Sequence, residues 1–234
     1  MYGSIFSNLF TVGNLFCGFL AMHYVFHGSF GPAAWLIVLA AVFDKMDGKI
    51  ARATGRTSQF GIEFDSIVDV CTFGVAPALM IYHSHLQSPW GLALAFAYLL
   101  CGALRLARFN VISLSNDRGE YYMGLPIPLA AICLTQYVVF TERAWDTSHA
   151  TPLAVFLVLS LAALMVSQFD YDSMPDFRGS GLGDRFKQLY FIASVLLIIY
   201  SAEDFFFPLA LLYILSGVYR WVIGWFHDEV TQHA

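Results

Sequence analysis

Residues 44–69 read DKMDGKIARATGRTSQFGIEFDSIVD, a stretch that places ionisable groups within otherwise apolar segments. It joins the polar ends of two apolar segments and carries four aspartates: Asp44, Asp47, Asp65 and Asp69. A helix turns by about 100° per residue, so Asp44 and Asp47 share one face of the first segment. Asp65 and Asp69 are four residues apart and share one stripe of the second segment. If the two faces pack together, all four carboxylates converge.

Four carboxylates that converge in a low-dielectric site repel one another strongly unless cations compensate them. Oxygen ligands of this kind suit Mg²⁺ or Mn²⁺, with Ca²⁺ as a further ion that such a site can bind. We therefore expect the four aspartates to hold two divalent cations. Such a pair suits transfer of a phosphoryl-type group, since the metals orient the attacking and leaving oxygens. A passive cation site and a cation transport path are the alternatives.

Small residues and one arginine accompany the aspartates on these two faces: Gly48, Ala51, Arg52 and Gly61. Glycine and alanine leave room for a bulky ligand, although in membrane helices they also permit close helix packing. Arginine can contact a phosphate through two parallel hydrogen bonds. The pattern therefore favours a large, phosphate-containing ligand beside the cations.

The composition predicts an all-α integral membrane protein with one domain over residues 1–234. The chain is 58% hydrophobic with a mean hydropathy of +0.64, and 12% of its residues are charged, against about 25% in soluble domains. Its apolar stretches approach the length of about 20 residues that a membrane helix needs. Eight membrane-crossing helices are expected, at residues 5–27, 32–56, 61–84, 90–113, 124–142, 151–168, 186–202 and 204–225.

The basic residues orient these helices, because cytoplasmic loops of membrane proteins are enriched in Lys and Arg. If the turn at 57–60 is cytoplasmic, Arg143 is external and the other members of the set of 12 Lys and Arg residues are cytoplasmic. We therefore expect both termini and the aspartates to face the cytoplasm of a prokaryotic cell. The polar ends of the second, third and fourth helices then meet on that side.

The spacing D-x2-D-G-x2-A-R-x8-G-x3-D-x3-D resembles the signature of the CDP-alcohol phosphotransferases at every fixed position. The resemblance implies a homodimeric membrane enzyme that uses two metals, joins the phosphate of a CDP-lipid to an alcohol and releases CMP. It implies membrane lipids as surroundings and no nucleic acid as a partner. It also implies a role for Asp69 as the base for the alcohol hydroxyl. The CDP-lipid site that it implies is formed by Asp47, Gly48, Ala51, Arg52 and Gly61.

Several further stretches resemble the phosphatidylserine synthase branch of that family: NLFTVGNLFCGFLA (8–21), DSIVDVCTFGVAPAL (65–79), CGALRLARFN (101–110), GLPIP (124–128) and LMVS (164–167). This resemblance implies in-line transfer of a phosphatidyl group from CDP-diacylglycerol to L-serine, giving phosphatidylserine and CMP. Archaeal ether lipids would suit the same apolar surroundings. Other branches would use glycerol 3-phosphate, inositol phosphate or choline. A cation transporter would be expected to show internal repeats or broken helices, and no repeat is visible.

Arg105 and Arg108 support serine as the alcohol that accepts the phosphatidyl group. They lie three residues apart at the cytoplasmic end of the fourth helix, and arginine binds carboxylates well. Serine carries a carboxylate that glycerol, inositol and choline lack. We expect this pair, with Asn110, to bind serine; the alternatives are that the arginines anchor the helix or hold the lipid phosphate.

Overall fold

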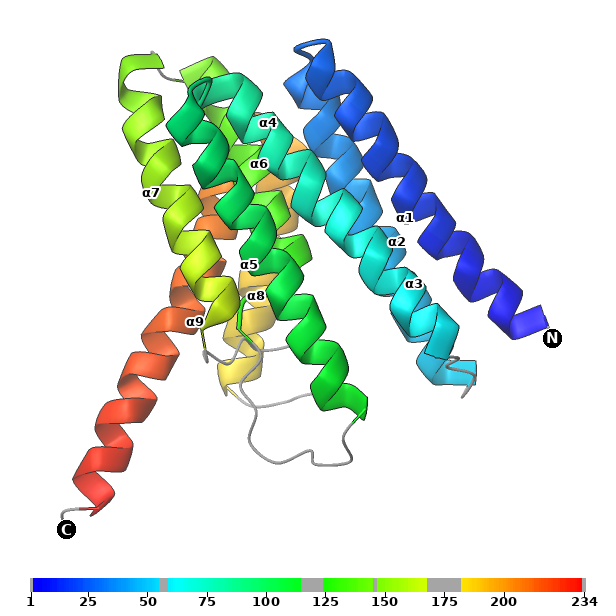
Figure 1. The fold of residues 1–234 in the computed structure, drawn as a ribbon. Helices are drawn as coiled ribbons and strands as arrows, with labels where there is room; N and C mark the ends of the chain where they lie inside the picture. Colours follow the sequence, from blue (N-terminus) through cyan, green and yellow to red (C-terminus); the bar gives the residue numbers. More distant parts are fainter. Residues whose placement is uncertain (1, 55–58, 115–123, 145–146, 168–181, 233–234) are drawn as a thin grey trace.

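The computed structural model describes residues 2–54, 59–114, 124–144, 147–167 and 182–232. Within these ranges the regular structure is entirely helical, as predicted (Figure 1). The elements are α1 (Tyr2–Phe26), α2 (Phe30–Thr54), α3 (Gln59–Asp69), η1 (Val70–Val75), α4 (Ala76–His85), α5 (Pro89–Leu114), α6 (Ile127–Ala144), α7 (Thr147–Val166), α8 (Leu182–Tyr200) and α9 (Ala202–Gln232).

Each predicted helix has a counterpart in the structure, with ends within a few residues except that α9 continues to Gln232. In the described part of the chain, 4 stretches are long and apolar enough to cross a membrane. They are Leu9–Phe26, Gln59–His85, Pro89–Ile112 and Ala202–Tyr219. The membrane character of the chain is thus supported, while the crossing of all eight helices stays a prediction.

The third predicted helix is interrupted by a π-helical turn that the sequence analysis did not anticipate. α3, η1 and α4 form one continuous rod, but the backbone of Val70–Val75 is wound as a π-helix. The Ala76 N–H accordingly donates to the carbonyl oxygen of Cys71, five residues earlier. The buried Tyr98 hydroxyl of α5 donates to the carbonyl oxygen of Phe73 at 3.1 Å. π-Helical turns often occur at functional sites, and this one begins directly after Asp69.

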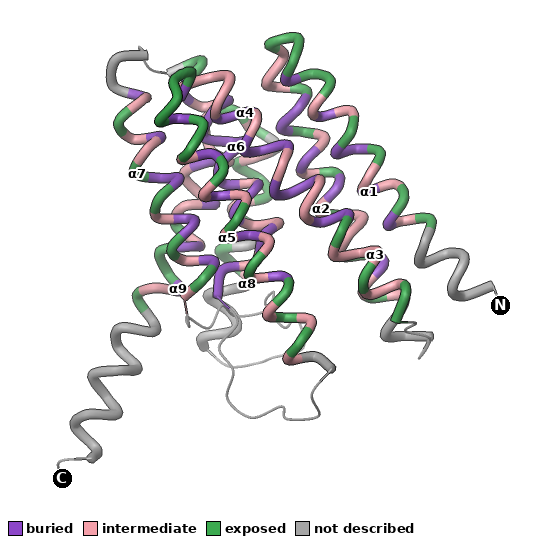
Figure 2. Tube along the Cα trace, viewed as in Figure 1, coloured by how far each residue is buried: buried purple, intermediate pink, exposed green. Residues whose placement is uncertain are grey.

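α6 lies at the centre of the bundle and organises the other helices. It packs against α2, α4, η1, α7 and α9, while α1 packs along α2 and α5 along α7. Large α6 side chains such as Leu134 and Tyr137 are completely buried, and in Figure 2 buried segments face the interior of the bundle. The four aspartates belong to α2 and α3, and α3 begins at the side of the bundle where the described ends of α1 and α9 lie (Figure 1).

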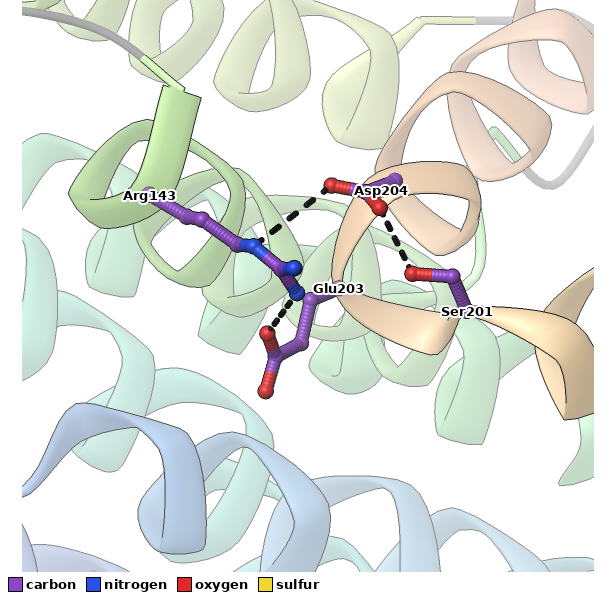
Figure 3. A network of polar contacts seen from close by, with 4 residues as sticks. All are labelled: Arg143, Ser201, Glu203 and Asp204. Atoms are coloured by element: carbon purple, nitrogen blue, oxygen red, sulfur yellow. Dashed lines mark hydrogen bonds and ion pairs between the residues drawn. The ribbon is translucent and has the colours of Figure 1, made fainter.

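A polar network joins the end of α6 to the start of α9 (Figure 3). Arg143 forms an ion pair with Glu203, and its Nε lies 4.0 Å from a carboxylate oxygen of Asp204. Ser201 donates a hydrogen bond of 2.6 Å to the other oxygen of Asp204. The Arg143 and Glu203 side chains are both more than half exposed, so screening by solvent keeps the contribution of the pair to stability small.

α1 approaches the π-helical turn very closely at Gly18. A Cβ atom built on Gly18 would lie 2.4 Å from Thr72 Oγ1 and 3.0 Å from Thr72 Cα. The absence of a side chain at Gly18 therefore allows the backbones of α1 and η1 to come together. The rod formed by α3, η1 and α4 therefore packs against α1 at the π-helical turn, which directly follows Asp69.

Gly18→Ala should lower the unfolding temperature of the protein in detergent, because the added methyl group forces α1 away from η1. Overpacking of this kind costs about 1–3 kcal/mol. Gly31→Ala is the matched control, since a Cβ atom there meets nothing within 4 Å, and it should not lower the unfolding temperature. Equal unfolding temperatures for Gly18→Ala and the unmodified chain would contradict the close approach.

Candidate active site

Three of the predicted metal ligands converge from two helices. One carboxylate oxygen from each of Asp44, Asp47 and Asp65 lies within 4.8 Å of the others. Asp44 and Asp47 come from the second half of α2, and Asp65 comes from α3. Helical spacing explains the arrangement, since residues three or four apart project from one face. The predicted packing of the two acidic faces is therefore present for these three aspartates.

The donor set of this cluster fits a divalent cation. All three ligand atoms are carboxylate oxygens, the type that Mg²⁺, Mn²⁺ and Ca²⁺ prefer. Asp47 is buried, and Asp65 Oδ1 is a buried atom without a hydrogen-bond partner. A buried, unpartnered carboxylate oxygen is costly, and Asp65 also experiences the charges of Asp47 and Asp44. A bound cation would relieve both penalties.

Asp69 lies beside this cluster but outside the group of three. Its carboxylate experiences the charges of Asp44, Asp65 and Asp47, so all four aspartates share one electrostatic environment. Asp69 Oδ1 accepts a hydrogen bond of 3.2 Å from Asn14 Nδ2 of α1. Both side chains are buried. Ligation of a metal by Asp69 therefore stays a prediction, whereas its hydrogen bond to α1 is part of the structure.

α1 contributes to the site in a way that the sequence analysis missed. Besides the contact of Asn14 with Asp69, Thr11 Oγ1 donates a hydrogen bond of 3.0 Å to Asp47 Oδ2. The available signal was weak: two small polar residues, three positions apart, in an otherwise apolar stretch. Such a pair on its own is compatible with many roles in a helical membrane protein.

The structure describes the side-chain surroundings of only some of the residues predicted to bind a CDP-lipid. Gly48 and Gly61 lie on α2 and α3, both partly exposed, close in sequence to Asp47 and Asp65. Ala51 and Arg52 continue α2, but their side chains lie outside the described residues. Their proposed contacts with a CDP-lipid stay predictions.

Arg105 faces the aspartates from α5. Its guanidinium is subject to the charges of Asp69 and Asp44, and to that of Arg108. Its Nε is a buried atom without a hydrogen-bond partner. Guanidinium groups bind carboxylates and phosphates in a planar, bidentate fashion. Arg105 is therefore suited to hold an anionic part of a substrate next to the acidic cluster.

Arg108 is turned toward the end of α7. It donates hydrogen bonds to the carbonyl oxygens of Val166, at 3.3 Å, and Ser167, at 3.1 Å. The Ser167 carbonyl group also lies against Gly124, whose φ of +65° and close packing leave no room for a side chain. A cation at a helix C-terminus is favourable because the last carbonyl groups carry partial negative charge. Arg108 therefore has a structural task, and its predicted contact with serine remains untested.

Asn110 lines a cavity of ≈ 320 Å³ between α5 and the α3–η1 rod. Its Nδ2 donates a hydrogen bond of 2.9 Å to Ser66 Oγ. Glu63 and Ser66 form the other polar lining, and none of the four aspartates lines this cavity. The structure thus brings Arg105 toward the aspartates but places Asn110 on a different side of the helix pair.

Comparison with known proteins places this site in a family. Residues 4–169 match the family model for CDP-alcohol phosphatidyltransferases. That match covers more than half of the chain and includes the acidic cluster, Asp69 and Arg105. The chain belongs to the CDP-alcohol phosphatidyltransferase family, as the spacing of its aspartates predicted.

Individual relatives extend the likeness over almost the whole chain. A CDP-diacylglycerol–serine O-phosphatidyltransferase of Helicobacter pylori J99 is 34% identical over 93% of this chain and 91% of its own length. The protein of the same name from Methanocaldococcus jannaschii is 34% identical, with 93% and 94% covered. An archaetidylserine synthase of Methanothermobacter thermautotrophicus is 35% identical over 70% of this chain and 68% of its own length.

Asp65→Asn should weaken binding of Mn²⁺ to the purified protein by more than about 100-fold, because loss of a partner outside the ligand shell alone typically costs 10–100-fold. Electron paramagnetic resonance of free and bound Mn²⁺ gives the Kd directly. Glu63→Gln is the control, since Glu63 is an exposed carboxylate on the same helix outside the cluster. An unchanged Kd for Asp65→Asn would show that the cluster is not the Mn²⁺ site.

Proposed function

We propose that the protein transfers the phosphatidyl group of CDP-diacylglycerol to the hydroxyl of L-serine, giving phosphatidylserine and CMP. The observation that carries this proposal is the acidic cluster with Arg105, whose Nε atom is buried and unpartnered, beside it in a chain of this family. Relatives that share 34% identity over nearly their full length bear the name of that activity. A cation transporter is disfavoured because the chain belongs to a family of transferases.

The four aspartates have different proposed roles in the reaction. Asp44, Asp47 and Asp65 would hold the divalent cations, with Asp69 beside them. When bound, the cations supply positive charge that neutralises the pyrophosphate and the developing negative charge on the leaving CMP. Gly48 and Gly61 leave space for the CDP-lipid, and Ala51 and Arg52 are proposed to complete its site.

Asp69 is the residue that we assign to proton transfer. A serine hydroxyl is a weak nucleophile at neutral pH and needs a base within reach. In the reaction the serine oxygen forms a bond to the phosphorus that carries the lipid, and the bond from that phosphorus to CMP breaks. The hydroxyl proton passes to the Asp69 carboxylate.

Arg105 is the best candidate for the residue that selects serine. Its guanidinium interacts with the charges of Asp69 and Asp44, and its Nε atom has no hydrogen-bond partner. A serine carboxylate bound there would place the serine side chain on the side of Asp69. Arg108 and Asn110 are assigned weaker parts, because Arg108 holds the end of α7 and Asn110 lines another cavity.

We further propose that the site and both termini face the cytoplasm, and that the enzyme is a homodimer. The distribution of Lys and Arg supports the orientation. The described ends of α1 and α9 lie at the same side of the bundle, where α3 also begins (Figure 1). The dimer is supported by the family resemblance alone.

The proposed function is tested by incubating the purified protein with Mn²⁺, CDP-diacylglycerol and one alcohol at a time, and measuring CMP. Serine should be turned over, whereas glycerol 3-phosphate, inositol phosphate and choline should not. A parallel series with a CDP-activated archaeal ether lipid determines which lipid tails are accepted. CMP release with another alcohol and none with serine would refute the serine assignment and leave the family intact.

Arg105→Ala should raise the KM for serine by tens- to thousands-fold if KM follows affinity. Loss of a buried contact between an arginine and a carboxylate costs roughly 2–5 kcal/mol. The affinity for CDP-diacylglycerol should change much less. Ethanolamine, which lacks the carboxylate, is the control substrate, and its weak turnover should not respond to the substitution. A loss of CDP-lipid affinity with an unchanged KM for serine would assign Arg105 to the lipid phosphate instead.

Asp69→Asn should lower kcat by about 10²–10⁴-fold, the usual contribution of a positioned base. Binding of CDP-diacylglycerol should survive, because Asp44, Asp47 and Asp65 remain. Equilibrium binding of the CDP-lipid and single-turnover CMP release separate these two effects. If kcat stayed within a few-fold of the unmodified enzyme, the base would have to be another group.

A further inference from the structure

Two neighbouring side chains of α1 each hold one of the aspartates. Thr11 Oγ1 donates to Asp47 Oδ2 at 3.0 Å, and Asn14 Nδ2 donates to Asp69 Oδ1 at 3.2 Å. Residues three apart on a helix project from the same face, so α1 presents both donors to α2 and α3 at once. None of these four side chains is more than 6% exposed.

The position of Asn14 is itself fixed by the packing of α1 on the π-helical turn. Thr72 Oγ1 donates to the carbonyl oxygen of Asn14 at 3.4 Å, and Gly18 lies directly against Thr72. Asn14 is completely buried, so water does not compete for its amide group. The backbone of Asn14 is therefore held against η1, next to Asp69.

The two contacts act on carboxylates with different tasks. Asp47 belongs to the cluster of three that fits a cation, whereas Asp69 lies outside that group. The amide of Asn14 donates to one oxygen of Asp69 and so restrains the orientation of the carboxylate. An asparagine amide is neutral and cannot take the hydroxyl proton in place of Asp69.

We propose that Asn14 is a positioning residue for Asp69, and that Thr11 is a positioning residue for Asp47. In this assignment α1 orients the carboxylate of the base, Asp69, through one contact and that of the cation ligand Asp47 through another. The inference rests on the proposed function of Asp69 as the base. It predicts that neighbouring substitutions on one helix give different kinetic defects.

The experiment compares Asn14→Leu with Thr11→Val, two substitutions of similar size that each remove a donor. Asn14→Leu should lower kcat by roughly 10–100-fold, the usual cost of losing such a supporting contact, and should leave the Mn²⁺ Kd unchanged. Thr11→Val should raise the Mn²⁺ Kd by a similar factor, and saturating Mn²⁺ should restore its kcat. Thr11→Ser keeps the hydroxyl and should restore the Kd. The Kd is measured by electron paramagnetic resonance without substrates.

A second comparison tests whether Asn14 acts through Asp69. Residues that act as a unit give non-additive effects, so Asn14→Leu should cause no further loss of kcat in an Asp69→Asn background. Asn14→Ala cannot clash with its neighbours and should reproduce the loss of kcat if Asn14→Leu fails to fold. An additive loss in the double variant, a raised Mn²⁺ Kd for Asn14→Leu, or an unchanged kcat would each overturn the assignment.

Failure of the proposed function is recognised separately. If the unmodified protein uses another alcohol and not serine, the comparison is made with that alcohol, because Asp69 would accept the proton of any hydroxyl. The contrast between Asn14 and Thr11 should then persist. If the protein turns over no alcohol in the panel, the proposed function and the assignment of Asn14 fall together, whereas the Mn²⁺ Kd of Thr11→Val still tests the assignment of Thr11.

Discussion

Mutual repulsion of carboxylates inside an apolar helical bundle is the constraint on which the rest of this structure depends. Asp44, Asp47 and Asp65 lie within 4.8 Å of one another, and Asp69 shares their electrostatic environment. Charges brought together in a medium of low dielectric constant destabilise a protein unless opposite charge or hydrogen-bond donors compensate them. The bundle supplies compensation in the form of Arg105 from α5 and neutral donors from α1, and we propose that divalent cations supply the rest.

Different helices supply the groups that compensate the aspartates. α1 can supply Thr11 and Asn14 because Gly18 lets it approach the π-helical turn without a side chain between them. That turn starts immediately after Asp69 and is held from the other side by the Tyr98 hydroxyl. The π-helical turn and the close approach of α1 therefore both lie next to Asp69, the residue to which proton transfer is assigned.

Much of this organisation could be predicted from the sequence, because it depends on local spacing. The apolar stretches predicted the helices, and the spacing of Asp44, Asp47 and Asp65 indicated that these three carboxylates would converge. The π-helical turn and the contacts from α1 to the aspartates could not be predicted. They join residues 36 and 55 positions apart, and such pairing follows from tertiary packing. Arg108 illustrates the same limit, since only the fold reveals that it binds the end of α7.

The central claim is that the clustered aspartates exist to bind divalent cations at a site of phosphoryl-type transfer. The most direct test is the number of Mn²⁺ ions bound per chain in the presence of CDP-diacylglycerol, measured by electron paramagnetic resonance on the unmodified protein. The account predicts two ions with a magnetically coupled signal, because both would be held by one group of carboxylates. Binding of no Mn²⁺, or of isolated ions whose signal shows no coupling, would contradict it.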